Sequence, residues 1–431
     1  MLIFDALYVL FLTFCLFFFQ KRILIVIPIL IAFNQTWFSF FFTLNTSSFD
    51  KIMINIEYYH AIFVLATGVW IIFTEKKFEL YKVPFIFFVL FSIILLNSLN
   101  YTTDIEYSRK NVGKFISILV TFFAYASYVQ GYPEFKAVMK SLLVSWALYV
   151  SYIVLTSVMQ IGDMATYAGQ SSIIYIGSLS FYELFPLSYF TFLLLVYFEL
   201  SEDKSTRKEY IRAVFLGVVT FIIFLLILKR TYIYLPVFGL GLYIFMGGRL
   251  KKLGTVMLLA IIVFGLLVIT GLADFFLFSF MIRADAIFRS PFEEGRFLEY
   301  VTYYEEIIKR TSLQTILFGT EIFNSFGKFF QIVYVNLGDR NSRVLHSDYT
   351  NILFGAGMIG LFLYFCFLAS MTYASIKIKE RKGLRLVLIA LMVTLIFNGF
   401  SDGILDYTNR YYPFLMIGAL YGFLVHGGKY N

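Results

Sequence analysis

The feature that most constrains this chain is the regular return of apolar runs about as long as a bilayer is thick. A helix needs about 20 predominantly apolar residues to cross the hydrocarbon core, and runs near that length follow one another along most of the sequence. Hydrophobic residues make up 60% of the chain and charged residues only 14%, which is more apolar surface than a water-soluble fold needs. The sequence therefore predicts an all-α, polytopic membrane helix bundle.

Charged residues, Gly, Pro and Asn divide these runs into about 13 predicted spans, within a range of about 12–14. The second span is the least regular, because Pro28 and Asn34 interrupt it. Together the spans form a single transmembrane domain over residues 1–431. They lie near residues 2–19, 23–43, 58–74, 83–98, 113–130, 141–160, 175–199, 213–228, 231–248, 254–272, 349–373, 384–400 and 410–427.

Basic residues gather in alternate connections between the spans. They occur near residues 21–22, 76–82, 136–140, 204–212, 249–252 and 377–385. By the positive-inside rule these connections are cytoplasmic, which places the C-terminus inside and the N-terminus outside. This bias explains the net charge of +8, so the basic balance does not indicate nucleic-acid binding.

One connection, residues 273–348, is long and is expected to be extracytoplasmic. Four apolar residues recur at helical spacing in its centre: Phe297, Val301, Tyr304 and Ile308. Two pairs of opposite charge stand four residues apart there, Glu305 with Lys309 and Glu306 with Arg310. The pattern predicts an amphipathic helix over the outer mouth of the bundle. A helix that only shields the bundle from water would have the same pattern, and both interpretations stay open.

GAGMIG, from Gly355 to Gly360, formally matches the dinucleotide fingerprint G-x-G-x-x-G. That fingerprint requires a preceding strand, a tight turn and a helix start, whereas this motif lies inside an apolar span. We interpret it as small-residue packing that lets two membrane helices approach closely. It does not predict nucleotide binding.

The stretch HSDYT contains His346, one of only three histidines in the chain, just ahead of a long apolar run. Ser347 or Asp348 can cap a helix that starts here, and the unpaired N–H groups of that helix would face outward, where they favour an anion. His346 and Tyr349 would share one face of it. A polar cap with an incidental histidine explains the same residues, so the pattern alone leaves both readings open.

Several basic residues lie at positions where membrane proteins rarely have them. Lys229 and Arg230 lie between two apolar runs with almost no connection, and an arginine at mid-bilayer costs at least about 2.5–3.5 kcal/mol. Short outer turns usually avoid such pairs, which favours function over simple snorkelling to lipid phosphates. Arg289 and Arg296 in the long loop are candidate phosphate ligands, because guanidinium groups grip phosphate oxygens in bidentate fashion.

The last outer turn, GFSDGILDYTNRYY, adds Asp402, Asp406 and Arg410, for which capping and turn formation are the default roles. No D-x-D pair or cluster of His, Cys and Asp has the spacing of a divalent-metal site. The two cysteines, Cys15 and Cys366, both fall inside apolar spans. The sequence therefore predicts neither a metal nor a cofactor.

Taken in order, these motifs resemble the O-antigen ligase and polymerase superfamily. The resemblance covers segments from about 220 to 365 and the turn near 402–410. It rests on Arg230 in a tight outer turn, Gly295-Arg296 opening the loop, Leu317-Phe318-Gly319, then His346-Ser347-Asp348-Tyr349 leading into the glycine motif. Residues 1–200 match only in being hydrophobic.

The chain departs from the family pattern at three positions. Thr231 follows the turn arginine where the family has glycine, Glu299 stands where an aromatic residue is usual, and Glu321 replaces the second glycine of a G-x-G. The H-S-x-Y element is matched well. Family ligases also carry an acidic residue in the last outer loop, a role for which Asp402 and Asp406 compete.

The resemblance implies an inverting, metal-independent membrane glycosyltransferase of the C type in the bacterial inner membrane. Donor and acceptor would be glycans on undecaprenyl diphosphate. Arg230 and Arg296 would stabilise charge on the leaving diphosphate, and His346 would accept the proton of the attacking hydroxyl or orient the diphosphate. Further substrate contacts are expected from Lys229, Arg289, Asp348, Tyr349, Asp402, Asp406 and Arg410.

We expect polymerisation of lipid-linked repeat units into O-antigen or capsular polysaccharide. An O-antigen ligase, which transfers the glycan to lipid A–core, shares every motif and differs only in its acceptor. A flippase or other transporter would place its charges at mid-membrane within two related halves, whereas here they gather at one face. Expected partners are the lipid-linked glycan, membrane lipid and a chain-length regulator protein, but no nucleic acid.

Overall fold

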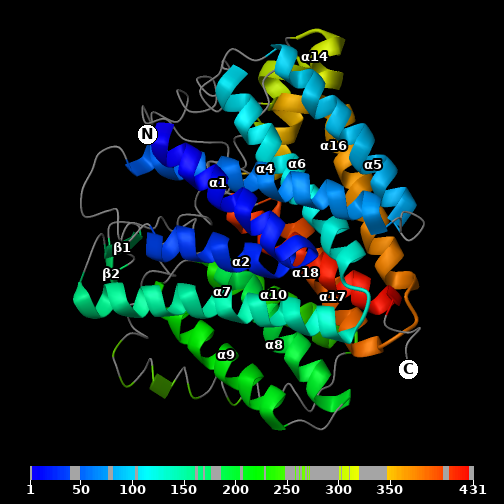
Figure 1. Ribbon diagram of the computed structural model, residues 1–431. Helices are drawn as coiled ribbons and strands as arrows, with labels where there is room; N and C mark the ends of the chain where they lie inside the picture. The colour runs from blue at the N-terminus through cyan, green and yellow to red at the C-terminus, as the bar shows by residue number, and fades with distance from the viewer. Residues whose placement is uncertain are drawn as a thin grey trace.

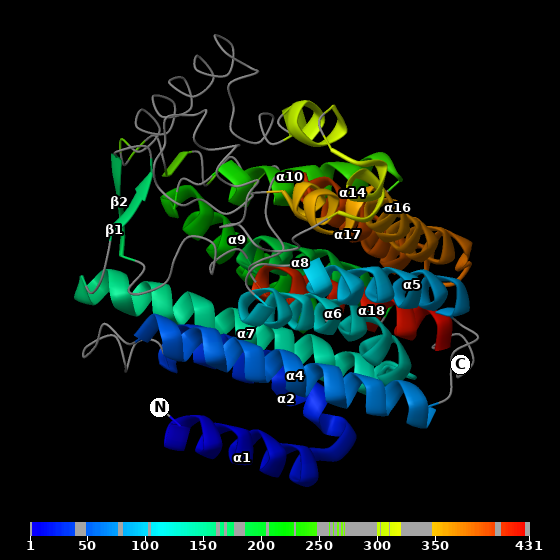
Figure 2. The same ribbon diagram turned by 90° about the horizontal axis from the view of Figure 1, so that it is seen from above.

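In the computed structural model, the described residues are helical apart from one short hairpin, so the predicted helical class is confirmed (Figures 1 and 2). The structure describes residues 2–38, 49–75, 81–101, 105–160, 164–167, 170–175, 186–203, 207–227, 230–247, 300–301, 303–309, 311–319, 347–400 and 407–426, with isolated positions at 258, 262, 265, 266, 269 and 271.

The first half of the chain contributes six helices and the hairpin: α1 (Leu2–Phe19), α2 (Ile23–Phe33), α4 (Phe49–Glu75), α5 (Lys82–Ser98), α6 (Ile105–Tyr128), α7 (Tyr132–Met159), β1 (Met164–Tyr167) and β2 (Gln170–Tyr175). The second half contributes α8 (Pro186–Asp203), α9 (Arg207–Ile227), α10 (Arg230–Phe245), α14 (Leu313–Phe318), α16 (Asp348–Lys377), α17 (Lys382–Asn398) and α18 (Tyr407–His426). Four short helical turns complete the described chain: η1 (Gln20–Arg22), η2 (Asn34–Phe38), η4 (Leu99–Tyr101) and η5 (Tyr303–Ile308).

Four described helical segments are long and apolar enough to cross a membrane: Leu7–Trp37, Tyr58–Glu75, Tyr132–Met159 and Asp348–Lys377. Shorter apolar helices accompany them at Lys82–Ser98, Pro186–Ser201, Tyr210–Phe224 and Leu235–Phe245. The first long segment is broken at Gln20, whose φ of 48° separates α1 from α2. A helical membrane protein is thus supported in outline, while the number of spans stays a prediction.

Pro28 does not end its helix, although the sequence pattern suggested an interruption there. A proline inside a helix leaves the carbonyl four residues earlier without its usual donor. Here the Tyr125 hydroxyl of α6 donates to that carbonyl, of Leu24, at 2.6 Å, and the Tyr412 hydroxyl of α18 donates to the Pro28 carbonyl at 2.8 Å. The Tyr125 hydroxyl therefore satisfies the one carbonyl that the proline leaves without its donor, as membrane helices require, and the Tyr412 contact attaches the same stretch of α2 to α18.

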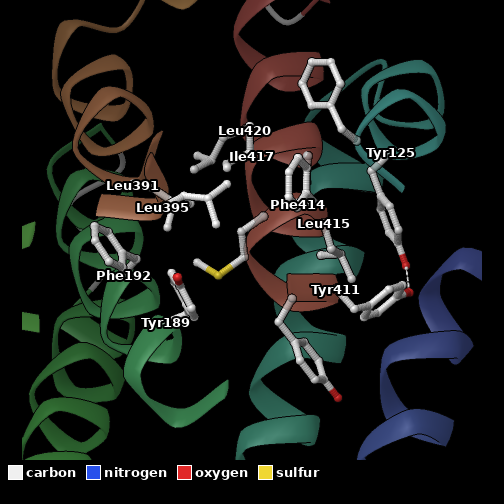
Figure 3. Packing of buried hydrophobic residues seen from close by; sticks show 14 of the residues in the cluster. Tyr125, Tyr189, Phe192, Leu391, Leu395, Tyr411, Phe414, Leu415, Ile417 and Leu420 are labelled. Carbon is white, nitrogen blue, oxygen red and sulfur yellow. Dashed lines mark hydrogen bonds between the residues drawn. The ribbon is translucent and has the colours of Figure 1, made fainter. Parts of the chain in front are cut away.

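Helix α18 forms the centre of the bundle, and its side chains are buried along almost the whole length from Arg410 to His426. A helix that is apolar all round belongs in a core. Figure 3 shows Tyr125 of α6 on one side of α18 and side chains of α8 and α17 on the other, namely Tyr189, Phe192, Leu391 and Leu395.

Two glycines let α18 approach α6 closely. A Cβ atom at Gly418 would lie 2.5 Å from the Phe122 carbonyl oxygen, and one at Gly422 would lie 2.7 Å from that of Ala126. The two contacts follow each other in the same order on both helices, so α6 and α18 run parallel and begin at the same end of the bundle. We call this end, where α16 also begins, the Asp348 end.

The glycine motif of α16 breaks the helix at Gly357, which has φ 67° and ψ −169°. Gly319, just after α14, has φ 71° and faces it. A Cβ atom at Gly357 would lie 2.3 Å from the Leu317 carbonyl oxygen, and one at Gly319 would lie 2.4 Å from the Gly355 carbonyl carbon. Close packing of small residues was expected, but the closest approach is to the end of α14, which lies beside α16 (Figure 1), not to a second membrane helix.

Replacing Gly357 by Ala should loosen this junction. The new Cβ atom would collide with backbone atoms of α14 and force a left-handed conformation that costs about 1–3 kcal/mol. We expect a lower midpoint of thermal unfolding in detergent and faster proteolysis between α14 and α16. Gly241→Ala is the matched control, because a Cβ atom at Gly241 of α10 meets nothing within 4 Å. Equal behaviour of the two variants would contradict the packing argument.

Candidate functional site

The described part of the predicted amphipathic helix is η5, which packs on the first turns of α16. The Tyr303 and Phe354 rings lie edge to face with centroids 5.1 Å apart, and Ile307 is buried beside them. The expected ion pair between Glu305 and Lys309 is present at 2.8 Å. Burial raises the pKa of the Tyr303 hydroxyl to about 12.

The buried face of η5 agrees with the predicted one only in part, because Ile308 packs against the buried cluster as expected. Tyr304 and Val301, which were expected to face the bundle, are 50% and 38% exposed, whereas Tyr303 and Ile307 are buried. The physical reason is that η5 is a π-helix, whose wider turn shifts the positions that share a face relative to an α-helix. The second predicted pair, Glu306 with Arg310, lies outside the described side chains.

Helix α16 begins where the sequence predicted, with Ser347 as its N-cap. The Ser347 hydroxyl oxygen accepts hydrogen bonds from the backbone N–H groups of Tyr349 and Thr350. It also donates to the Gly399 carbonyl at 2.9 Å, and the Asp348 N–H donates to the same carbonyl at 2.9 Å. The start of α16 is thereby attached to the end of α17.

A buried ion pair joins α16 to α18. The Arg410 guanidinium lies 2.6 Å from the Asp348 carboxylate, and each side chain is only 2% exposed. Arg410 also donates to the Tyr189 hydroxyl of α8 at 3.2 Å, and the Asn398 amide of α17 donates to that hydroxyl at 2.9 Å. Four helices therefore meet through one charged network at the Asp348 end.

Tyr349 points into the protein at this junction. Its hydroxyl donates to the Ile396 carbonyl of α17, and its ring packs on Phe365 and Phe400. A Cβ atom at Gly399 would lie 2.6 Å from the Tyr349 ring. Three predicted substrate contacts, Asp348, Tyr349 and Arg410, are thus brought together, but here they bind protein groups, and direct contact with substrate stays a prediction.

The remaining predicted site residues cannot be placed. His346, Arg289, Arg296, Lys229, Asp402 and Asp406 lie outside the described residues, and of Arg230 only the backbone is described, as the first residue of α10. Among the described residues, no three His, Cys, Asp or Glu side chains gather as a metal site would need. The expected absence of a metal stays a prediction.

Lys114 and Asn111 are buried polar residues that sequence reasoning missed. The predicted span 113–130 begins one residue before Lys114, but α6 begins at Ile105 and Lys114 is only 7% exposed. Gly418 of α18 packs against Phe122 of α6, and the two helices run parallel. Arg410 precedes Gly418 by the same number of residues as Lys114 precedes Phe122, so Arg410 and Lys114 lie at the same level of the bundle. The recurrence of polar residues at helical spacing was the available signal: Ser108, Asn111, Lys114, Ser117 and Thr121 are all buried.

No protein-family model, no curated protein and no solved structure matches the chain. The family resemblance therefore stays a prediction based on the motifs.

The Asp348–Arg410 pair should show strong coupling in a double-mutant cycle. Asp348→Asn and Arg410→Met each leave the other group buried without its partner, which typically costs about 3–5 kcal/mol. The double variant should lose less stability than the sum of the single variants, measured by unfolding in detergent. Lys309→Met at the exposed Glu305–Lys309 pair is the control, with an expected loss of about 0–1 kcal/mol. Additive losses at the buried pair would show that the two charges act independently.

Proposed function

We propose that this chain is an inverting, metal-independent glycosyltransferase that polymerises undecaprenyl-diphosphate-linked repeat units into O-antigen or capsular polysaccharide. Its active site would face the exterior of the bacterial inner membrane, below the segment 273–348, in a bundle of about 13 spans with a cytoplasmic C-terminus and a C-type glycosyltransferase architecture. The supporting observation is that segments carrying the family-like motifs, far apart in the sequence, converge at the Asp348 end.

Three contacts document this convergence. Tyr300 of the long segment lies 2.9 Å from the Ser347 hydroxyl, between the two side-chain oxygens. Gly319 of the L-F-G stretch packs on the glycine motif of α16. Phe238 of α10 stacks on Phe397 near the end of α17, with ring centroids 4.7 Å apart. Further along α10, the Tyr243 hydroxyl donates to Glu199 near the end of α8, and Glu199 packs against Gly383 at the start of α17. Helix α10 therefore runs away from the Asp348 end, and its start at Arg230 lies toward that end.

The chemistry of polyprenyl diphosphate departure explains why cations belong at this end. Negative charge builds on phosphate oxygens as the glycosidic bond breaks, and without a metal the protein must stabilise it. Arg230 and Arg296 are proposed for this role; loss of one such preorganised donor typically costs about 2.7–4 kcal/mol at the transition state. The N-terminus of α16 adds its dipole. His346, next to the cap in sequence, would accept the acceptor's proton or orient the diphosphate.

The buried pair and Lys114 have supporting roles in this proposal. Because Asp348 and Arg410 neutralise each other, they fix the start of α16 without adding net charge. Lys114, level with Arg410, brings a further basic side chain to the same end. A transporter would instead need ionisable residues around a central cavity in two related halves.

Alanine variants of Arg230, Arg296 and His346 test the site. Each should reduce chain elongation by about 100-fold or more, while protein level and the accessibility of engineered cysteines stay unchanged. Arg385→Ala is a matched control, since Arg385 binds the Ile378 carbonyl in the connection between α16 and α17, at the opposite end of those helices. Near wild-type elongation in all three site variants would refute the assignment.

A deletion strain separates the candidate functions. Loss of long polymer, with one repeat unit still attached to lipid A–core, is the expected result for a polymerase. Long polymer that accumulates on its lipid carrier would indicate a ligase instead, and repeat units stranded on the inner leaflet would indicate a flippase. The readout is gel analysis of the lipopolysaccharide together with analysis of the lipid-linked intermediates.

A further inference from the structure

A groove with a volume of about 560 Å³ lies between α4, α5 and α6. Its lining is apolar along most of its length, with Ile62 and Val69 of α4, Ile93 of α5 and Ile116 of α6 as examples. Ile62, Val69 and Ile93 are 38–55% exposed. In a membrane bundle such a groove opens toward lipid. The volume lies within the range of pockets that enclose small ligands, about 300–1,000 Å³.

The groove is long and narrow. Its lining on α4 extends from Tyr58 to Phe73, which at about 1.5 Å per residue corresponds to about 22 Å. This length approaches the hydrocarbon thickness of a bilayer, about 30 Å. A hydrocarbon tail is the ligand chemistry that fits an apolar channel of this shape.

One end of the groove carries a cation. Arg109 lines it beside Tyr58, near the start of α6 and therefore at the Asp348 end. Within the described chain Arg109 has no ion-pair partner, whereas its neighbour Lys110 binds Glu106 at 2.8 Å. A guanidinium group favours phosphate oxygens, so the charge indicates a lipid with an anionic phosphate headgroup.

A hydroxyl group lies part-way along the groove. Ser92 of α5 lines it, and the Ser92 hydroxyl oxygen is buried without a hydrogen-bond partner in the described chain. Leu99 lines the groove at the same end as Arg109, and Ser92 of α5 precedes Leu99 by seven residues. Ser92 therefore lies about 10 Å further into the membrane than Leu99. An unsatisfied buried hydroxyl is costly. Rotation about the Cα–Cβ bond of Ser92 would turn this hydroxyl into the groove, where an ester carbonyl would satisfy it. An isoprenoid tail carries no acceptor.

We propose that this groove, which we call the α4–α6 groove, binds an anionic glycerophospholipid from the surrounding membrane. The phosphate contacts Arg109, an ester carbonyl accepts a hydrogen bond from the Ser92 hydroxyl, and one acyl chain fills the apolar length. Gly113 leaves the room for that chain, because a Cβ atom there would meet only the Tyr58 ring, at 3.8 Å. The proposal is independent of the glycosyltransferase activity.

The test uses the full chain in detergent, exchanged into excess phosphatidylglycerol or into phosphatidylcholine with the same acyl chains, followed by native mass spectrometry. Phosphatidylglycerol should be retained and phosphatidylcholine largely lost, because the cationic choline group of the latter opposes the attraction of its phosphate to Arg109. Arg109→Gln should reduce that retention by about tenfold, and Gly113→Leu should remove it. Gly241→Leu, at a position with open space around its Cβ atom, should behave as wild type. Equal retention of both lipids, or no effect of Arg109→Gln and Gly113→Leu, would overturn the proposal.

Two further arms identify the occupant. Ether-linked phosphatidylglycerol, which lacks the carbonyl, should bind more weakly than the ester form, and Ser92→Ala should abolish the difference. Inorganic phosphate should not displace the lipid. Preferential retention of a polyisoprenyl phosphate, or displacement by phosphate alone, would contradict a glycerophospholipid site. Ser92→Ala removes only one buried oxygen, so it keeps the proposal testable even if Gly113→Leu does not fold.

Discussion

The ion pair between Asp348 and Arg410 is the interaction on which the rest of this end of the protein depends. Both side chains are almost completely excluded from solvent, and transfer of either charge alone into an apolar interior would be strongly unfavourable. Each is stable only if the other occupies its present position. The pair therefore specifies one register between α16 and α18, and Tyr189 and Asn398 extend that constraint to α8 and α17.

The same ion pair also fixes the surface of α16 on which the described part of the long segment packs. The start of α16 is capped by Ser347 and attached to Gly399, so η5 packs on a surface whose position is fixed. Further along α16, Gly357 and Gly319 allow the backbone of α16 and the backbone at the end of α14 to touch. Two attachments hold the described part of the long segment against α16, one through aromatic rings and one through backbone contact. Side chains that different helices contribute to the Asp348 end therefore have little freedom to move apart.

Features encoded locally could be predicted from the sequence. The helical class, the start of α16 at Ser347 and the Glu305–Lys309 pair each depend on residues within a few positions of one another. Features set by distant contacts could not. Nothing near Asp348 indicates Arg410 as its partner, and the donor that satisfies the carbonyl freed by Pro28 comes from α6. Ile308 was predicted on the buried face of η5, but Tyr303 and Ile307 were missed because a π-helix has a different period.

Helix α6 carries two sets of side chains, one facing the protein interior and one facing the α4–α6 groove. Ser108, Asn111 and Lys114 are buried toward the protein interior, whereas Arg109, Val112, Gly113 and Ile116 line the α4–α6 groove. Because these two sets alternate along the same helix, the first turns of α6 present positive charge on both faces at the Asp348 end. Rotation of α6 would expose one set at the expense of the other. The close approach of Gly418 and Gly422 to α6 prevents that rotation, so the packing of α18 keeps the two faces apart.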